Sequence, residues 1–193
     1  MSEPALVLAS ASPRRAALLA GLGLVFRVRA ADVDETPRPD EPPGETAARL
    51  AREKALAVAR VESLPVLAAD TLVVIDGLAL GKPGSAAEAR AMLARLQGRS
   101  HEVVTGVCLL HSGRARAAVE RSEVAFHSMS PAEIDWYVST GEPLDKAGAY
   151  HVDGRGALFI SGVYGSPSNV AGLPVRVVLD LLRQAGVATG LPR

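Results

Sequence analysis

The chain has 193 residues, of which 48% are hydrophobic, and its basic and acidic residues balance to a formal charge of zero. This length is enough for one well-buried domain and marginal for two. No basic excess favours a nucleic-acid or anionic-membrane surface, so we expect neither partner. No apolar run approaches the roughly 20 residues that span a bilayer, and residues 1–8 lack the basic start of a signal peptide.

The single cysteine, Cys108, lies in an apolar run at residues 103–110. We therefore expect a core thiol in a reducing compartment rather than a catalytic nucleophile, and a cytoplasmic protein.

Alternating strand and helix patterns predict an α/β domain. Ser12 and Pro13 are typical of a helix start, with Ser at the N-cap and Pro at the first helical position. In the first part of the chain we expect strands at residues 5–9, 25–29 and 65–69, helices from 12 to 21 or 23 and at 45–61, and a loop at 32–44.

In the second part, Asp76-Gly77 predicts a tight hairpin turn, and Ser130 with Glu133 predicts a capping box. We expect strands at 72–75, 78–80, 102–110, 115–126 and 157–163, and helices at 85–97, 130–139 and 173–184. No repeat or linker divides the chain, so we expect one domain over residues 1–193 with a frayed tail at 189–193.

The segment from Ser10 to Arg15 joins a strand to a helix N-terminus, where free N–H groups and the helix dipole attract anions. Arg14 and Arg15 are unfavourable for the helix itself, but they suit a phosphate chain bound there. The alternative is an ordinary capped helix with two solvated arginines.

Only three of the 21 basic residues are Lys, which draws attention to each: Lys54, Lys82 and Lys146. Lys54 is four residues from Leu50 and from Val58, so it falls within the buried stripe of its helix. A charge directed inward needs a partner or a cavity, unless its stem carries the ammonium out to solvent.

Asp70 and Thr71 directly follow the predicted strand 65–69. Ligands of open α/β sheets gather at the carboxyl ends of strands, so Asp70 is placed to hold a metal or accept a proton from water. The alternative is an Asp that closes a turn.

Three loop segments carry further candidates. Gly81-Lys82-Pro83 offers a compact cation beside a flexible glycine, and Asp145-Lys146 is either functional or a structural ion pair. The acids Asp32, Asp34 and Glu35 offer metal ligands or a solvated loop. Together, spaced cations and carboxylates match the needs of phosphoryl transfer, in which cations neutralise phosphate oxygens and one carboxylate activates water.

The chain resembles the Maf family in seven segments that occur in the family's order and spacing. They are Ala9-Ser10-Ala11-Ser12-Pro13-Arg14-Arg15, Ala51-Arg52-Glu53-Lys54-Ala55, Ala69-Asp70-Thr71, Gly81-Lys82-Pro83, Leu96-Gln97-Gly98-Arg99-Ser100-His101, Asp145-Lys146-Ala147-Gly148-Ala149-Tyr150 and Asn169-Val170-Ala171-Gly172-Leu173-Pro174. The family name comes from an association with septum formation.

The resemblance implies an α/β fold with a long mixed central sheet flanked by helices and a cleft between two lobes, related to the inosine triphosphate pyrophosphatases. It also implies a homodimer, a divalent cation (Mg²⁺ or Mn²⁺), and hydrolysis of nucleoside triphosphates to monophosphate and pyrophosphate. A house-cleaning role that includes modified nucleotides would fit this activity.

The resemblance also implies roles for individual residues. Asp70 corresponds to the general base, and Glu35 with Asp70 to the metal-binding acids. Phosphate binding falls to Ser10, Arg14, Lys54 and Lys82, and substrate selectivity to Arg15, Thr71 and Asp153. Lys146 lies in the segment that resembles the branch preferring dTTP and UTP.

One position departs from that branch, which continues Gly-Ile-Gln-Gly after the tyrosine where this chain has His151-Val152-Asp153-Gly154. An ionised Asp only accepts hydrogen bonds, whereas Gln also donates. If Asp153 faces the base, it can accept the N–H of uracil or thymine but repels their carbonyls. A different base preference is therefore one alternative; others are a nucleotide-binding regulator of division with little turnover and a different phosphohydrolase on this scaffold.

Overall fold

The structure is a computed structural model that describes residues 3–190. Its contacts divide the chain into two compact units. The first comprises Met1–Asp70, Thr105–Glu120 and Gly172–Arg193, and the second comprises Thr71–Val104 and Arg121–Ala171. Of the predicted frayed tail, residues 189 and 190 are in neither helix nor strand, and residues 191–193 lie outside the described range.

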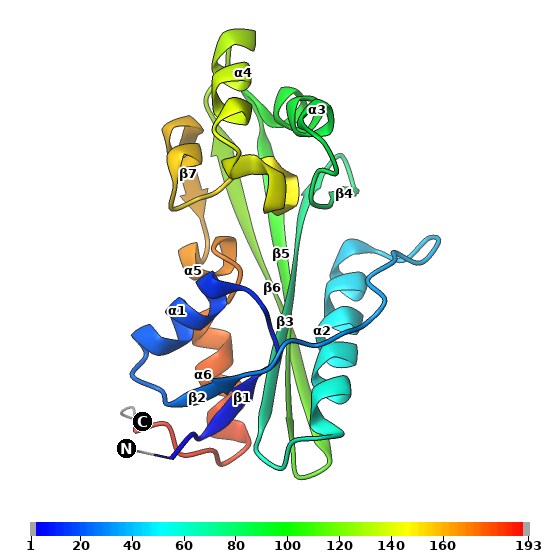
Figure 1. The fold of residues 1–193 in the computed structure, drawn as a ribbon, viewed down its shortest axis with the longest axis vertical. Helices are drawn as coiled ribbons and strands as arrows, with labels where there is room; N and C mark the ends of the chain where they lie inside the picture. The colour runs from blue at the N-terminus through cyan, green and yellow to red at the C-terminus, as the bar shows by residue number, and fades with distance from the viewer. Residues whose placement is uncertain (1–2, 191–193) are drawn as a thin grey trace. The chain divides into compact units, whose positions relative to one another are not determined.

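Within residues 3–190, the strands are β1 (Leu6–Leu8), β2 (Phe26–Val28), β3 (Val66–Ile75), β4 (Leu78–Leu80), β5 (Ser100–His111), β6 (Arg114–Phe126) and β7 (Ile160–Tyr164). In this described range they form a seven-stranded sheet of order β2-β1-β3-β5-β6-β7, with β4 paired to β3 (Figure 1). β1 pairs in parallel with both β2 and β3, whereas β3–β4 and β6–β7 are antiparallel. The predicted α/β class with a mixed sheet is confirmed.

Over the same range, the helices are α1 (Pro13–Gly21), α2 (Pro43–Ala59), α3 (Ala86–Leu96), α4 (Pro131–Ser139), α5 (Pro167–Val170) and α6 (Val175–Gln184). Three short 3₁₀ helices are η1 (Glu142–Asp145), η2 (Ala147–Ala149) and η3 (Arg155–Phe159). No helix within residues 3–190 is both long and apolar enough to cross a membrane.

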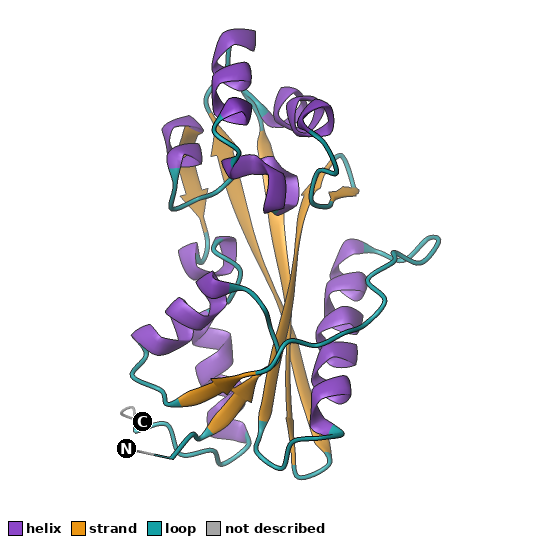
Figure 2. Ribbon diagram, in the orientation of Figure 1, coloured by secondary structure: helices purple, strands orange, loops and turns teal. Residues whose placement is uncertain are grey.

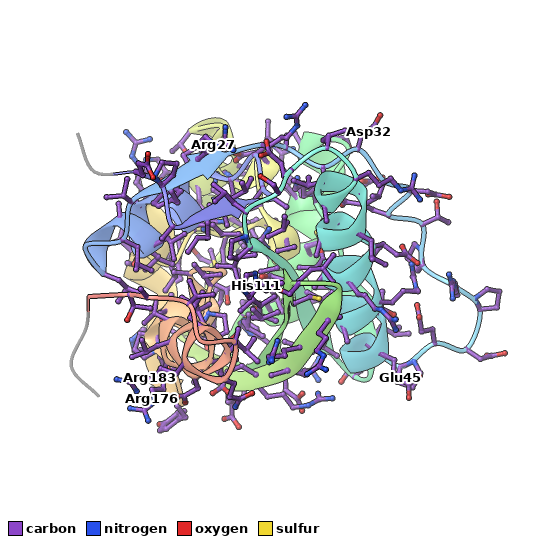
Figure 3. All side chains as sticks on the ribbon, turned by 90° about the horizontal axis from the view of Figure 1, so that it is seen from below. Arg27, Asp32, Glu45, His111, Arg176 and Arg183 are labelled. Atoms are coloured by element: carbon purple, nitrogen blue, oxygen red, sulfur yellow. The ribbon has the colours of Figure 1, made fainter. Side chains whose placement is uncertain are left out.

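The first unit buries both faces of its part of the sheet. Leu67 and Ala69 of β3 pack into a cluster with residues of α1 and α6, such as Leu19 and Leu182. The alternate residues, represented by Ala68, pack with α2 and the buried Cys108. Side chains alternate along a strand, so even-numbered residues of β3 point toward α2. Figures 1 and 3 show α2 and α6 on opposite sides of these strands.

The second unit has one core cluster, which includes Val73, Leu93 and Tyr137. The hairpin of β3 and β4 turns at Asp76 and Gly77, both with positive φ as a two-residue turn of this type requires. The helices α3 and α4 pack against each other in this unit (Figure 2), and α4 begins with the predicted capping box.

Two sequence predictions were wrong in their boundaries. Strand β3 does not end at residue 69 but continues through Asp70 and Thr71, because the neighbouring β5 pairs with it and because the charge of Asp70 is compensated. Residues 157–159 belong to η3 rather than to a strand, since the preceding N–H groups of Arg155 and Gly156 donate to Glu142 instead of to a neighbouring strand. The helices η1, η2 and α5 were not predicted.

Helix α2 approaches β5 closely at Gly106. A Cβ built on Gly106 would lie 2.3 Å from the carbonyl carbon and oxygen of Ala47, which belong to the backbone of α2 and cannot move aside alone. This contact sets the distance between α2 and the sheet.

We therefore expect Gly106→Ala to lower the free energy of unfolding by about 3 kcal/mol, the upper end of the usual overpacking cost. Urea unfolding followed by circular dichroism measures this. Gly21→Ala is the matched control, because a Cβ there meets nothing within 4 Å. Equal stability of the two variants would show that α2 shifts freely.

Candidate functional site

The N-terminus of α1 lies directly after β1 and is built as the sequence predicted. Ser12 caps the helix by accepting the backbone N–H of Arg15 at 3.4 Å, and Pro13 follows at the first helical position. Ser10 is buried, and its Oγ accepts the backbone N–H of Ser12 at 3.2 Å. The free N–H groups of the first turn make this end attractive to an anion.

The two arginines of α1 are used differently. The guanidinium of Arg15 donates from Nε to the carbonyl oxygen of Gly172 at 2.8 Å and from Nη1 to Ser10 Oγ at 3.3 Å. Burial lowers the pKa of Arg15, and the adjacent Arg14 adds to this effect. Arg14 is half-buried, and within residues 3–190 its side chain forms no hydrogen bond or ion pair. Arg14 is thus the arginine that remains available to an anion.

Lys54 points inward from α2, as its place in the buried stripe predicted, and only 7% of it is exposed. Its Nζ lies 2.6 Å from Asp70 Oδ1 and 2.7 Å from Glu35 Oε1. The stem does not carry the charge out to solvent. One ammonium therefore joins a buried carboxylate on the sheet to a carboxylate from the loop before α2.

Asp70 lies within β3, so the prediction that it follows the end of its own strand was wrong. The strand whose carboxyl end lies near Asp70 is instead β1. It pairs in parallel with β3 through Leu8 and Leu67 and ends at Leu8. Asp70 stands three residues beyond Leu67, next to the place where the chain leaves β1 for α1. Because even-numbered residues of β3 face α2, the carboxylate of Asp70 meets Lys54.

Electrostatics link the helix end to the Lys54 group. The charge of Arg15 interacts with the carboxylates of Asp70 and Glu35, both of which favour its charged form. The cluster then has three cations (Arg14, Arg15 and Lys54) and two carboxylates. Its excess positive charge at a helix N-terminus suits a polyanion such as a phosphate chain.

The oxygen donors of this cluster fit a hard divalent cation. No three Asp, Glu, His or Cys side chains gather as metal ligands within residues 3–190. Mg²⁺, however, is commonly held by one or two carboxylates together with substrate phosphates and water, and Glu35 and Asp70 converge on one point at Lys54 Nζ. Of the other loop acids, Asp34 accepts hydrogen bonds from Thr36, and Asp32 is exposed (Figure 3).

The remaining predicted residues belong to the second unit. Lys82 is exposed, with no side-chain partner within residues 3–190, and Thr71 is half-buried. Lys146 forms an ion pair with Asp145. The loops of Lys82 and Lys146 are joined, because the backbone N–H of Gly148 donates to the carbonyl oxygen of Gly81 at 3.1 Å.

Asp153 is exposed on a segment organised by Glu142. The Glu142 carboxylate accepts the Tyr137 hydroxyl at 2.8 Å and the backbone N–H groups of Arg155 and Gly156 at 3.0 Å each. Burial acts to raise the pKa of Glu142, but these donors lower it on balance. The carboxylate thereby holds the backbone directly after Asp153, and the Tyr137 hydroxyl, which accepts the backbone N–H of His151 at 3.0 Å, holds the backbone before it.

Sequence reasoning did not predict how three side chains hold these loops: Glu41, Arg49 and Glu142. Glu41 and Arg49 form an ion pair across eight positions, and Glu142 binds backbone groups 13 and 14 residues away. Helical neighbours occur at spacings of three and four, so no local pattern in the sequence indicated either arrangement.

Comparison with known proteins gives close relatives over nearly the whole chain. A protein of Anaeromyxobacter dehalogenans (strain 2CP-C) named dTTP/UTP pyrophosphatase is 54% identical, covering 95% of this chain and 95% of its own. A protein of the same name from Myxococcus xanthus (strain DK1622) is 53% identical, covering 94% and 93%.

Among solved structures, the Staphylococcus aureus Ham1 protein matches the fold with a TM-score of 0.53. The two are 15% identical, and the match covers 93% of this chain and 98% of that one. This likeness concerns the fold alone. The family model described as Maf-like protein matches residues 5–185, so the chain belongs to the Maf-like protein family.

Proposed function

We propose that this protein hydrolyses dTTP and UTP to the nucleoside monophosphate and pyrophosphate with the help of a divalent metal. The observation that carries the proposal is the buried Lys54, which holds Asp70 and Glu35 beside the N-terminus of α1. Relatives about half identical over 94–95% of the chain bear the name of this activity.

We assign phosphate binding first to groups that can still donate a hydrogen bond to a ligand. The first-turn N–H groups and Arg14 belong to the start of α1, and Ser10 Oγ accepts the backbone N–H of Ser12, the N-cap of that helix. A phosphate chain bound there receives charge-assisted hydrogen bonds, which are stronger than neutral ones. We assign Lys54 and Lys82 to the same task, because their ammonium groups neutralise charge as it develops on phosphate oxygens.

Asp70 is the group that we assign as general base. It accepts a proton from a water molecule that attacks the α-phosphorus in line with the leaving pyrophosphate. A carboxylate in the middle of a sheet strand is held rigidly, which suits a base that must meet one water in one orientation. A divalent cation held by Glu35 and Asp70 would supply Lewis-acid stabilisation of the phosphate oxygens.

Base selection belongs in this proposal to Arg15, Thr71 and Asp153, with Lys146 in the neighbouring segment. Arg15 already holds Ser10 and the Gly172 carbonyl, so its influence would be exerted through their positions. Asp153 is exposed, and within residues 3–190 its side chain forms no hydrogen bond or ion pair, which leaves its carboxylate able to meet a ligand. We further propose a homodimer that acts in the cytoplasm, where nucleoside triphosphates are made.

Product analysis tests the proposal directly. With dTTP, UTP, CTP or GTP and Mg²⁺, we expect monophosphate and pyrophosphate from dTTP and UTP, and no turnover in excess chelator. Diphosphate with orthophosphate would show a different phosphohydrolase. Tight binding without turnover of any of the four nucleotides would instead indicate a nucleotide-binding regulator.

Asp70→Asn keeps the shape of the side chain but removes the base. We expect kcat for the best substrate to fall by roughly 10²–10⁴-fold, the usual contribution of a positioned base. Asp180→Asn, which makes the same change on the surface of α6, serves as the control and should keep wild-type turnover. Near-normal kcat in Asp70→Asn would remove Asp70 from the role.

Asp153→Gln restores a side chain that can donate to a pyrimidine carbonyl. We expect the preference for dTTP and UTP over CTP, measured as a ratio of kcat/KM values, to rise about fivefold, equivalent to one hydrogen bond of roughly 1 kcal/mol. Asp153→Asn shares the loss of charge but has the shorter reach, and it should give a smaller rise. An unchanged ratio in both variants would show that Asp153 does not face the base.

A further inference from the structure

The loop at residues 29–42, between β2 and α2, carries Glu35 and is bound at two points by Arg49 of α2. The guanidinium of Arg49 in α2 donates from Nε to Glu41 Oε1 and from Nη2 to Glu41 Oε2, each at 2.7 Å. It also donates from Nη1 to Glu53 Oε2 at 3.2 Å. A bidentate pair of this kind fixes direction as well as distance. We call Arg49 and Glu41 the loop clamp.

The clamp acts close to Glu35 as well as at the far end of the loop. Arg49 Nη2 donates to the carbonyl oxygen of Thr36 at 3.4 Å, which belongs to the residue directly after Glu35. On the other side, Asp34 Oδ1 accepts the backbone N–H of Thr36 at 2.9 Å and its hydroxyl at 2.6 Å. The backbone directly after Glu35 is therefore held by the side chains of Asp34 and Arg49 rather than by strand or helix pairing.

The clamp is better shielded than the ion pair that Arg38 of the same loop forms with Glu53. The side chains of Arg49 and Glu41 are 13% and 12% exposed, whereas those of Arg38 and Glu53 are 63% and 34% exposed. Glu41 also accepts the hydroxyl of Thr46 at 2.9 Å, at the start of α2. The bonds from Arg49 lower the pKa of Glu41 to about 2, so the pair stays charged at neutral pH.

Glu35 needs such support. More than half of its side chain is exposed, at 57%, yet its Oε1 lies 2.7 Å from the buried Nζ of Lys54. An exposed side chain on an irregular loop keeps one position only when its backbone is fixed, since ordering it costs conformational entropy.

We propose that Arg49 and Glu41 are positioning residues that hold Glu35 at the metal-binding and phosphate-binding site. This inference rests on the proposed function in assigning Glu35 to that site. The clamp touches neither substrate nor metal; it acts through Glu35. Removing a residue that orients a metal ligand in this way commonly changes metal affinity by roughly 10–100-fold.

The test is Glu41→Gln, which preserves volume but removes the charge that Arg49 binds. In the metal-free protein we expect amide hydrogen exchange at residues 32–42 to rise about tenfold, with exchange in β3 unchanged. We expect the dissociation constant for Mn²⁺ alone, measured by electron paramagnetic resonance, to rise at least about tenfold. Arg38→Gln is the matched control, because it breaks a pair on the same loop but leaves the clamp intact.

A double-variant cycle separates action through Glu35 from a general effect. In a Glu35→Gln background, Glu41→Gln should weaken Mn²⁺ binding by less than twofold, since the residue that it positions is already lost. Equal weakening in both backgrounds, or wild-type Mn²⁺ affinity in Glu41→Gln, would overturn the proposal.

Arg49→Lys is a second variant, which keeps the positive charge but lacks the planar guanidinium that binds both oxygens of Glu41. It should also raise amide hydrogen exchange at residues 32–42. These measurements do not depend on turnover. A protein that hydrolyses no nucleotide would refute the proposed function, while the exchange and Mn²⁺ results would still decide on the clamp.

Discussion

The structure of the first unit depends on a buried ammonium. A carboxylate inside a sheet strand is costly unless an opposite charge meets it, and Lys54 meets Asp70 at 2.6 Å. This requirement fixes the face that α2 presents to β3. It also explains why α2 must lie close to the sheet, a distance set by Gly106 against the backbone at Ala47. A larger residue at position 106 would move the helix that carries Lys54. The packing of α2 against the sheet and the position of Lys54 at the site therefore depend on each other.

The two neighbouring arginines at the N-terminus of α1, Arg14 and Arg15, have different roles. Arg15 has a structural role. Its guanidinium donates to Ser10 and to the carbonyl oxygen of Gly172, and the carboxylates of Asp70 and Glu35 favour its charged form. Arg14 has no side-chain partner within residues 3–190. An unpaired cation such as Arg14 gains a full charge-assisted hydrogen bond when it binds phosphate. Arg15 therefore helps to form the site, and Arg14 remains available to bind an anion.

What the sequence could predict was local. Ser12 and Ser130 cap helices, Asp76-Gly77 turns a hairpin, and Lys54 falls in an apolar stripe, because each of these depends on residues a few positions apart. Asp70 was recognised as a candidate but misplaced at a strand end, since the length of β3 is decided by its pairing with distant β5. The pairing of Glu41 with Arg49 was not predicted for the same reason: it depends on how the loop folds back on α2. The roles expected for the site residues came from the family resemblance, and the side chains that they contact became known only from the structure.

The two acids on Lys54 differ in their support, and this difference fits the different tasks assigned to them. Asp70 is 6% exposed on a sheet strand, where neighbouring strands limit its movement. Glu35 stands on an irregular loop in which Asp34 and Arg49 bind the backbone of Thr36 and Arg49 also binds Glu41. A general base must keep its orientation toward one water molecule, so a strand is the better platform. The carboxylate of Glu35 has no such platform, and its position at Lys54 depends on the bonds that Arg49 makes to Glu41 and to the backbone of Thr36. The same site thus holds one acid by strand pairing and the other by charged side-chain bonds.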